Sequence, residues 1–292
     1  MIKKIILILI LLLLVSFTVA GEVGTLSAQD ESMESKIKKI LKERADKYGN
    51  QFGIVVGIVN EKGSKVIRYG KLGRDGNQEV NGSTVFELCS VTKIFTAVLL
   101  ADMVERGEVN LNDPIEKFLP KSIKVPTKNG KKITPLHLAT HTSGLPNTPD
   151  NSSLQDDKPG YVGYTEQQLY DFLSNYTLTG DIGSRVQYSN LGMGLLGHIL
   201  TLKSGMPYEA MVIKRICRPL KMNSTRRKLS PELRKRLAVG QYLNGQVTKN
   251  WRIPPLLAGA GSFRSTTDDM RRDSWGVYGP VLPGCQYQKG II

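Results

Sequence analysis

The sequence predicts an α+β protein in which an antiparallel sheet is flanked by helices and joined to a mostly helical region. A helix with one apolar stripe is predicted over residues 33–48. An apolar, β-branched run at 52–59 and its return at 65–69 predict a β-hairpin. Helical patterns dominate the rest of the chain, without the regular strand–helix alternation of a parallel sheet. These patterns together predict the α+β class.

Further helices are predicted from apolar patterns and start signals. The longest, at 90–106, is apolar on nearly every face and is expected to lie deep in the protein. Two more helices are expected at 191–203 and 207–217, and a long loop at 142–164. Capping residues and prolines mark the starts of three shorter helices, at Asp113-Pro114, Thr134-Pro135 and Thr165 with Gln168.

The composition is that of an ordinary globular protein. Of 292 residues, 40% are hydrophobic and 23% charged, which excludes collagen-like, coiled-coil and wholly disordered chains. The three cysteines form no CxxC pair. A disulfide framework and a cysteine-rich zinc site are therefore not expected.

Positive charge is concentrated in one part of the chain. The formal net charge is +14, and residues 203–272 hold 16 Lys or Arg but only 4 Asp or Glu. A solvated basic face, or affinity for anionic polymers of the cell envelope, explains this excess. The segment lacks the interleaved aromatic residues that stack on bases. Nucleic acid is therefore not the expected partner.

The N-terminus has the pattern of a secretory signal peptide. Lys3 and Lys4 precede an apolar run at 5–15, and small residues allow cleavage after Ala20 or Ala28. The alternative is an uncleaved anchor, although the run is short for a membrane span. Export to the periplasm, cell envelope or exterior is therefore expected. The predicted organisation is a signal peptide at 1–28, a domain at 29–270 and a divergent tail at 271–292.

Two motifs that resemble ligand sites have simpler explanations. His137 and His141 are four residues apart, but the segment HLATH lacks the glutamate of HExxH and has no evident third ligand. They are better explained as core or loop-anchoring residues. The glycines of GxGxxG at 192–197 lack a preceding strand and a following acidic residue. Close helix packing accounts for them better.

A serine and a lysine at the start of the most apolar helix carry candidate chemistry. Ser90 and Lys93 are three residues apart, so one helix face presents both side chains. A serine needs a neighbouring base to become a nucleophile, and a desolvated lysine loses proton affinity. The helix N-terminus also favours developing negative charge. The spacing alone is weak evidence, because Ser35 and Lys38 share it.

A tyrosine and an asparagine further along the chain complete the candidate site. Tyr188 and Asn190 lie where a polar loop meets an apolar helix. A phenol there can shuttle a proton, and an amide can hold a substrate carbonyl. The bare YxN pattern is common, since Tyr48 and Tyr242 also begin one. A turn with a packed tyrosine remains an alternative.

Several longer stretches resemble the class C β-lactamase and penicillin-binding-protein-like serine hydrolases, and among them most resemble D-alanyl-D-alanine carboxypeptidase/endopeptidases. These stretches occur in the family's order and spacing: FELCSVTKIFTAVLLADMVERGEVNLNDPIEKFLP, KKITPLHLATHTSGLP, GSRVQYSNLGMGLLGHIL, RPLKMNST and LLAGAGSFRSTTDDM. The resemblance implies a β-lactamase/D,D-peptidase-like fold and covers about residues 33–270.

The resemblance also implies a mechanism. Ser90 is the implied acyl-enzyme nucleophile, Lys93 its partner, Tyr188 the general base and acid, and Asn190 the residue that positions substrate. The implied substrates are D-Ala-D-Ala peptides of peptidoglycan or β-lactams, and neither metal nor organic cofactor is expected. Cys89 is expected to be a small buried residue and not a catalytic thiol.

One family motif has no counterpart in this sequence. A Lys-Thr-Gly or His-x-Gly stretch is expected well after Met270, together with further strands and a final helix, but the segment 271–292 does not match them. The missing strand is the implied source of a second oxyanion donor. The alternative function is therefore a catalytically defective, truncated family member that at most binds peptidoglycan or β-lactams.

Overall fold

The computed structural model describes residues 32–47, 53–60, 63–72, 78–152, 160–242 and 246–278. The predicted signal peptide, Cys285 and the predicted tail beyond residue 278 lie outside the described residues. Within the described part of the chain, none of the helices has the length and apolarity that a bilayer crossing requires.

The predicted N-terminal helix and hairpin are both present. Helix α2 spans Met33–Lys47. Strands β1 (Ile54–Asn60) and β2 (Gly63–Tyr69) pair antiparallel, with Val56 opposite Ile67. Ile67 is buried, as the apolar side of a half-covered hairpin should be.

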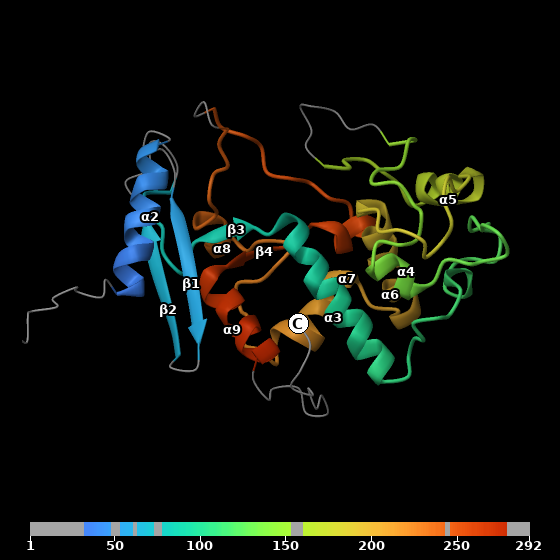
Figure 1. Ribbon diagram of the computed structural model, residues 1–292, viewed down its shortest axis with the longest axis horizontal. Helices are drawn as coiled ribbons and strands as arrows, with labels where there is room; N and C mark the ends of the chain where they lie inside the picture. The colour runs from blue at the N-terminus through green and yellow to red at the C-terminus, as the bar shows by residue number, and fades with distance from the viewer. Residues whose placement is uncertain are drawn as a thin grey trace, which may run out of the picture. The chain divides into compact units, whose positions relative to one another are not determined.

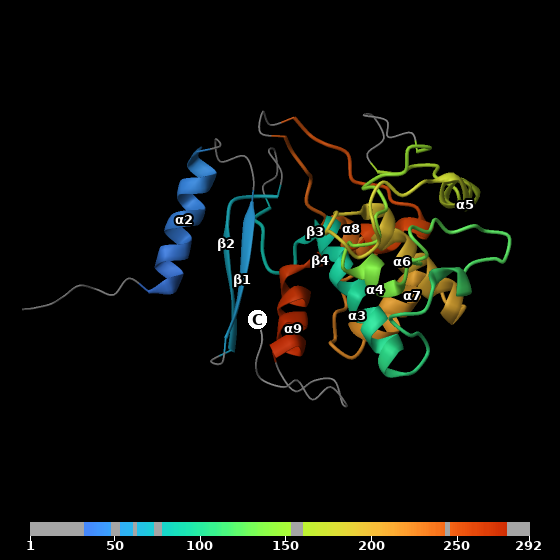
Figure 2. The ribbon, with the colours of Figure 1, turned by 45° about the vertical axis from the view of Figure 1, so that its right-hand side comes forward.

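A second small sheet was not predicted. Strands β3 (Val85–Glu87) and β4 (Arg264–Thr266) pair antiparallel. Helix α9 (Thr267–Tyr278) follows β4 directly and packs against β1, as Figure 2 shows. The approach is close, because a Cβ atom at Gly57 would lie 2.9 Å from Thr267 Cγ2. Glycine at this position therefore lets the helix reach the strand.

Helix α3 (Thr92–Glu105) belongs to the main helical core. It contacts α6 (Asn190–Ser204), α7 (Tyr208–Val212) and the 3₁₀ helix η4 (Pro255–Ala260), all labelled or traceable by colour in Figure 1. Its buried side includes Phe95, Leu99 and Met103, whereas Ile94 is 48% exposed. The expectation that α3 is buried on nearly every face is therefore wrong. A helix with apolar residues on every face need not be buried on every face, since single apolar side chains are tolerated at a protein surface.

Short helices connect these elements. Thr134 and Thr165 cap their helices with reciprocal capping boxes, as predicted. The predicted Asp113 cap is wrong, because Pro114 takes the N-cap position and Asp113 Oδ1 accepts instead from Lys117 Nζ at 2.5 Å. The short helices are η1 (Cys89–Val91), η2 (Ile115–Lys117), α4 (Pro135–Ala139), α5 (Glu166–Asn175), the π-helical η3 (Ile213–Cys217) and α8 (Pro231–Lys235).

The glycines of the GxGxxG pattern bring α6 and η4 together. A Cβ atom at Gly194 would lie 2.6 Å from Leu257 Cδ2, and one at Gly197 would lie 3.1 Å from Gly259 Cα. This confirms that the pattern reflects helix packing. The close contact also fixes η4, whose last residue reaches the site described next.

Candidate active site

Ser90 lies in the tight turn η1, which leads directly into α3. The preceding residue, Cys89, has a φ of 45°, a left-handed conformation that is uncommon outside glycine. Such residues concentrate near functional sites. The side chain of Ser90 is exposed, at the positive end of the helix. The turn therefore presents the hydroxyl to an incoming molecule.

Lys93 is buried directly behind Ser90. It is 9% exposed, and its Nζ donates to Ser90 Oγ at 3.2 Å, Asn190 Oδ1 at 2.7 Å and Ala260 O at 2.7 Å. These three acceptors match the three N–H bonds of an ammonium group. Burial lowers the pKa of Lys93, and its interaction with Tyr188 counteracts part of that effect. The side chain is thus held in one place and made easier to deprotonate.

Tyr188 approaches Ser90 from the other side. Its hydroxyl donates to Ser90 Oγ at 2.7 Å, and Lys93 Nζ lies 4.7 Å from the centre of its ring. Partial burial alone would raise the pKa of Tyr188, but its interactions with Lys93 and Ser90 outweigh burial and lower that pKa. Tyr188 is 47% exposed, so the phenol borders solvent. It is placed to exchange a proton with Ser90.

Asn190 begins α6 and faces Lys93. Ser189 is the N-cap of that helix and accepts from Gly192 N at 2.8 Å. Asn190 N donates to Asn147 Oδ1 at 3.2 Å. The four predicted residues therefore meet at one point, although Asn190 Oδ1 contacts Lys93, and its role toward substrate stays a prediction.

Two contributors to the site were not found from the sequence. The carbonyl of Ala260 holds Lys93, and the carbonyl of neighbouring Gly259 accepts from Thr96 Oγ1 at 2.8 Å. Asn147 holds the backbone of Asn190. A backbone carbonyl has no residue-type signature, so no sequence pattern indicates Ala260. Asn147 acts through its side-chain Oδ1 and lies 43 residues from Asn190, so no local pattern links the two.

The two histidines anchor loops, as the simpler explanation predicted. His137 Nδ1 accepts from Thr134 N at 3.2 Å and completes the capping box of α4. His141 Nδ1 accepts from Ser189 N at 3.1 Å. Among the described residues, no three His, Cys, Asp or Glu side chains gather into a group that could hold a metal ion.

Cys89 is exposed, so the expectation of burial is wrong. It follows β3 at the surface turn that carries Ser90, a position that faces outward together with the serine. The partial burial that remains and the carboxylate of Glu87 raise the pKa of its thiol. A raised pKa keeps the thiol protonated and unreactive at neutral pH.

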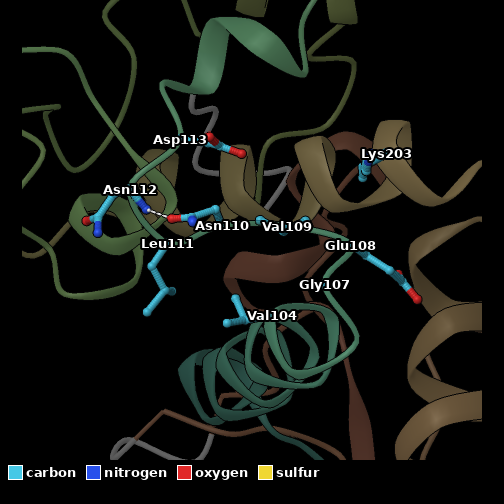
Figure 3. Close-up of a pocket in the computed structure, with 9 residues that line it drawn as sticks. All are labelled: Val104, Gly107, Glu108, Val109, Asn110, Leu111, Asn112, Asp113 and Lys203. Carbon is cyan, nitrogen blue, oxygen red and sulfur yellow. Dashed lines mark hydrogen bonds between the residues drawn. The ribbon is translucent and has the colours of Figure 1, made fainter.

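Two concavities lie away from these side chains. The larger, of about 530 Å³, is where α3 ends and the segment 107–113 follows (Figure 3). The smaller, of about 250 Å³, lies between β1, the β3–β4 sheet and α9. Neither is lined by Ser90 or its partners. The hydrogen bonds that join Ser90 to Lys93 and Tyr188, and not either concavity, therefore locate the candidate active site.

Known proteins resemble this chain over most of its length. A D-alanyl-D-alanine-carboxypeptidase/endopeptidase AmpH from Escherichia coli (strain K12) is 34% identical over 226 residues, covering 77% of this chain and 57% of that protein. A protein named Beta-lactamase from the same strain is 33% identical over 224 residues, covering 75% of this chain and 55% of that protein. The chain thus spans little more than half the length of these relatives.

A solved structure confirms the fold. The beta-lactamase/D-alanine carboxypeptidase from Yersinia pestis complexed with citrate superimposes with a TM-score of 0.71 and 26% identity, covering 82% of this chain and 67% of that one. The predicted α+β, β-lactamase/D,D-peptidase-like fold is therefore confirmed. The family model described as Beta-lactamase matches residues 37–276. The chain accordingly belongs to the Beta-lactamase family.

Proposed function

We propose that the protein is a serine acyl hydrolase that forms an acyl-enzyme at Ser90. One observation carries the proposal: Ser90 Oγ lies within hydrogen-bond reach of both Lys93 Nζ and Tyr188 OH. A nucleophile beside a base that is itself held by a third group is the general arrangement for covalent catalysis. The fixed amine and the pKa-lowered phenol supply that arrangement.

Acylation begins with the proton of Ser90. In the reactive form Tyr188 has lost its own proton, which its lowered pKa beside Lys93 favours, and its phenolate accepts the Ser90 proton as Ser90 Oγ bonds to the substrate carbonyl carbon. The charge of Lys93 stabilises the negative charge on the phenolic oxygen. The backbone N–H of Ser90 is a donor for the oxyanion that forms, a contact of the kind that contributes strongly to such reactions.

Release of product uses the same groups in reverse. As the carbon–nitrogen bond of the substrate breaks, Tyr188 returns the proton to the leaving amine. Water then attacks the ester at Ser90, giving its proton to Tyr188, and the serine oxygen leaves with that proton. The complete cycle consumes only substrate and water, and it returns Ser90 and Tyr188 to the protonation states in which they began.

The substrate class is proposed from the relatives. One relative is named a D-alanyl-D-alanine-carboxypeptidase/endopeptidase and another a Beta-lactamase. D-Ala-D-Ala peptides of peptidoglycan and β-lactams both present an amide carbonyl to a serine nucleophile. We therefore propose these two classes as substrates, together with export to the envelope, where peptidoglycan lies. The export proposal is supported by the N-terminal pattern at 1–28 and is tested by N-terminal sequencing of the secreted chain.

Labelling with a fluorescent penicillin tests the proposal. Wild-type protein should take up one label, and Ser90→Ala should take up none, because only the hydroxyl can form the ester. Ser35→Ala is the matched control, since Ser35 belongs to the other SxxK pattern and is exposed on α2. It should label like wild type. Folding of each variant is checked by circular dichroism.

Two measurements on the wild-type protein can contradict the proposal. If folded wild-type protein takes up no label and releases no D-alanine from a D-Ala-D-Ala peptide, catalysis is rejected. The alternative, a family member that binds without turnover, then predicts reversible binding of penicillin to the folded chain, measured by calorimetry.

A further inference from the structure

His141 is bound to the segment that carries Tyr188 through both its backbone and its side chain. Its carbonyl oxygen accepts from Gln187 N at 2.7 Å, and its Nδ1 accepts from Ser189 N at 3.1 Å. These are the residues on either side of Tyr188. The backbone of Tyr188 is therefore fixed at both ends by a single histidine.

The imidazole also contacts the phenol itself. The ring centres of His141 and Tyr188 are 4.7 Å apart, with an angle of 35° between the ring planes. His141 has a φ of 60°, in the left-handed region that histidine, asparagine and aspartate adopt more often than other non-glycine residues. This backbone conformation lets the carbonyl and the ring of His141 both reach the segment that carries Tyr188.

The hydrogen bond to Ser189 requires a neutral imidazole. An Nδ1 atom that accepts from a backbone N–H carries no proton, so the proton of the ring sits on Nε2. Burial and the positive charge of Lys93 on α3 lower the pKa of His141. Tyr188 is the titratable group in ring contact, and Arg185 on the same loop donates to Gln187 Oε1. The surroundings of His141 thus favour the neutral imidazole, which is the form that can accept from Ser189 N.

We propose that His141 is a positioning residue that holds the Tyr188 hydroxyl against Ser90 Oγ through its Nδ1 bond to Ser189 and its ring contact. It acts through Tyr188, and the inference rests on the proposed function. Misplacing a catalytic group by about 1 Å can cost about 10²-fold in rate. The contribution of His141 is therefore expected in kcat more than in KM.

Two substitutions separate the hydrogen bond from the size of the side chain. In His141→Asn the amide oxygen takes the place of Nδ1, and asparagine tolerates the left-handed backbone. In His141→Gln the polar end moves to the place of Nε2, and the bond to Ser189 is lost. We expect a rate about 10- to 100-fold below wild type for His141→Gln. We expect His141→Asn to recover most of that loss through the restored bond to Ser189, and to stay below the wild-type rate because the ring contact is absent.

His137→Gln is the matched control. His137 makes the same kind of Nδ1 contact, with Thr134 N, but it belongs to the capping box of α4. We expect this variant to keep the wild-type acylation rate. If His137→Gln and His141→Gln lower the rate equally, the effect is a general loss of loop structure and the proposal is overturned.

The pH profile gives a second readout. Protonation of His141 makes Nδ1 a donor, which then opposes the N–H of Ser189 instead of accepting from it. The acylation rate of the wild type should therefore fall as pH decreases below the lowered pKa of this histidine. His141→Asn has no imidazole, so its profile should lack the part of the acid limb that belongs to His141 and keep the part set by protonation of Tyr188. An unchanged acid limb in His141→Asn contradicts the proposal.

A third readout does not depend on activity. The phenol of Tyr188 is titrated by ultraviolet difference spectroscopy against Tyr188→Phe, and His141→Gln should raise its pKa by moving it away from Lys93. If the wild type is never acylated, the proposed function fails while this titration still tests His141. A folded His141→Gln with wild-type rate, pH profile and Tyr188 titration would falsify the inference.

Discussion

The chain contains the SxxK pattern twice, and the two copies have different surroundings. Lys38 on α2 is 60% exposed at its side chain and pairs with Glu34 at 2.8 Å, an ordinary i,i+4 contact. Lys93 is 9% exposed and donates to three acceptors. The spacing of serine and lysine is the same, so the spacing does not create the reactive arrangement. What differs is the number of chain segments that converge on the amine.

Distant segments supply that convergence at Lys93. Two of its acceptors, Asn190 Oδ1 and Ala260 O, are 97 and 167 residues away in the chain. They come from the start of α6 and the end of η4, which pack against each other. The comparison therefore predicts that changes at Lys93 and at the α6–η4 contact affect activity, whereas the same changes elsewhere do not.

The largest expected effect comes from replacing the amine. Lys93→Met fills a similar volume but removes the charge beside Tyr188, whose pKa should then rise. We expect acylation to slow by about 10²- to 10⁴-fold, the usual range for a group that assists proton transfer. Lys38→Met should keep the wild-type rate. The rates are measured by time-resolved uptake of a fluorescent penicillin.

Equal rates in the two lysine variants would contradict a role for Lys93 in acylation. If folded Lys93→Met and Lys38→Met are acylated at equal rates, the buried lysine does not assist Ser90. Circular dichroism and thermal unfolding establish whether Lys93→Met is folded, because the substitution leaves Asn190 Oδ1 and Ala260 O without their donor.

A smaller effect is expected at the glycines of α6. A Cβ atom at Gly194 would lie 2.6 Å from Leu257 Cδ2 and 3.1 Å from Leu257 Cα, so Gly194→Ala must displace η4. Overpacking of this kind typically costs about 1–3 kcal/mol of unfolding free energy. Because η4 carries Ala260, the acylation rate should fall as well. Urea unfolding and penicillin uptake measure the two effects.

Gly205→Ala is a control that should lower the unfolding free energy by a similar amount without contacting η4 or the candidate site. Its φ is 67°, and a Cβ atom there meets nothing within 4 Å. Gly205→Ala should cost about 1–2 kcal/mol through backbone strain alone. Its acylation rate should equal that of the wild type. A rate loss in Gly205→Ala as large as in Gly194→Ala shows that lower stability alone explains the effect.

The sequence predicted well what local patterns and long motifs encode. Periodicity located the N-terminal helix, the hairpin and the long core helices, and the capping box of Thr165 marked the start of α5. The motifs around Ser90, Lys93, Tyr188 and Asn190 selected residues that the fold brings together. Their catalytic roles remain predictions until the variants are measured.

Other features depended on contacts that no local pattern records. Strands β3 and β4 are each three residues long, too short for a recognisable alternation, and they pair across more than 170 residues. Lys93 Nζ donates to the backbone carbonyl of Ala260, and the side chain at position 260 gives no indication of that bond. The capping prediction for Asp113 failed because Pro114 adopts extended backbone there and takes the N-cap position itself.

The smallest expected effect is a change at His198 that alters the pH dependence of stability but not that of activity. His198 is buried in α6, its Nε2 lies 2.9 Å from Tyr170 OH, and burial lowers its pKa from the ordinary value of 6.5. The unfolded chain therefore binds more protons than the folded chain once pH falls below about 6.5. Stability is fully present above that pH and decreases toward the lowered folded-state pKa.

Replacing His198 with glutamine should flatten this decrease. The amide can keep a hydrogen bond with Tyr170 OH but does not titrate. The slope of stability against pH should become shallower without vanishing, because burial also lowers the pKa of His137 and His141. Thermal unfolding at a series of pH values between about 5 and 8 measures the slope. The acid limb of acylation should remain in His198→Gln, since that limb is assigned to His141 and Tyr188. If His198→Gln removes the acid limb as well, loss of folded protein and not the state of His141 sets the pH dependence of the reaction.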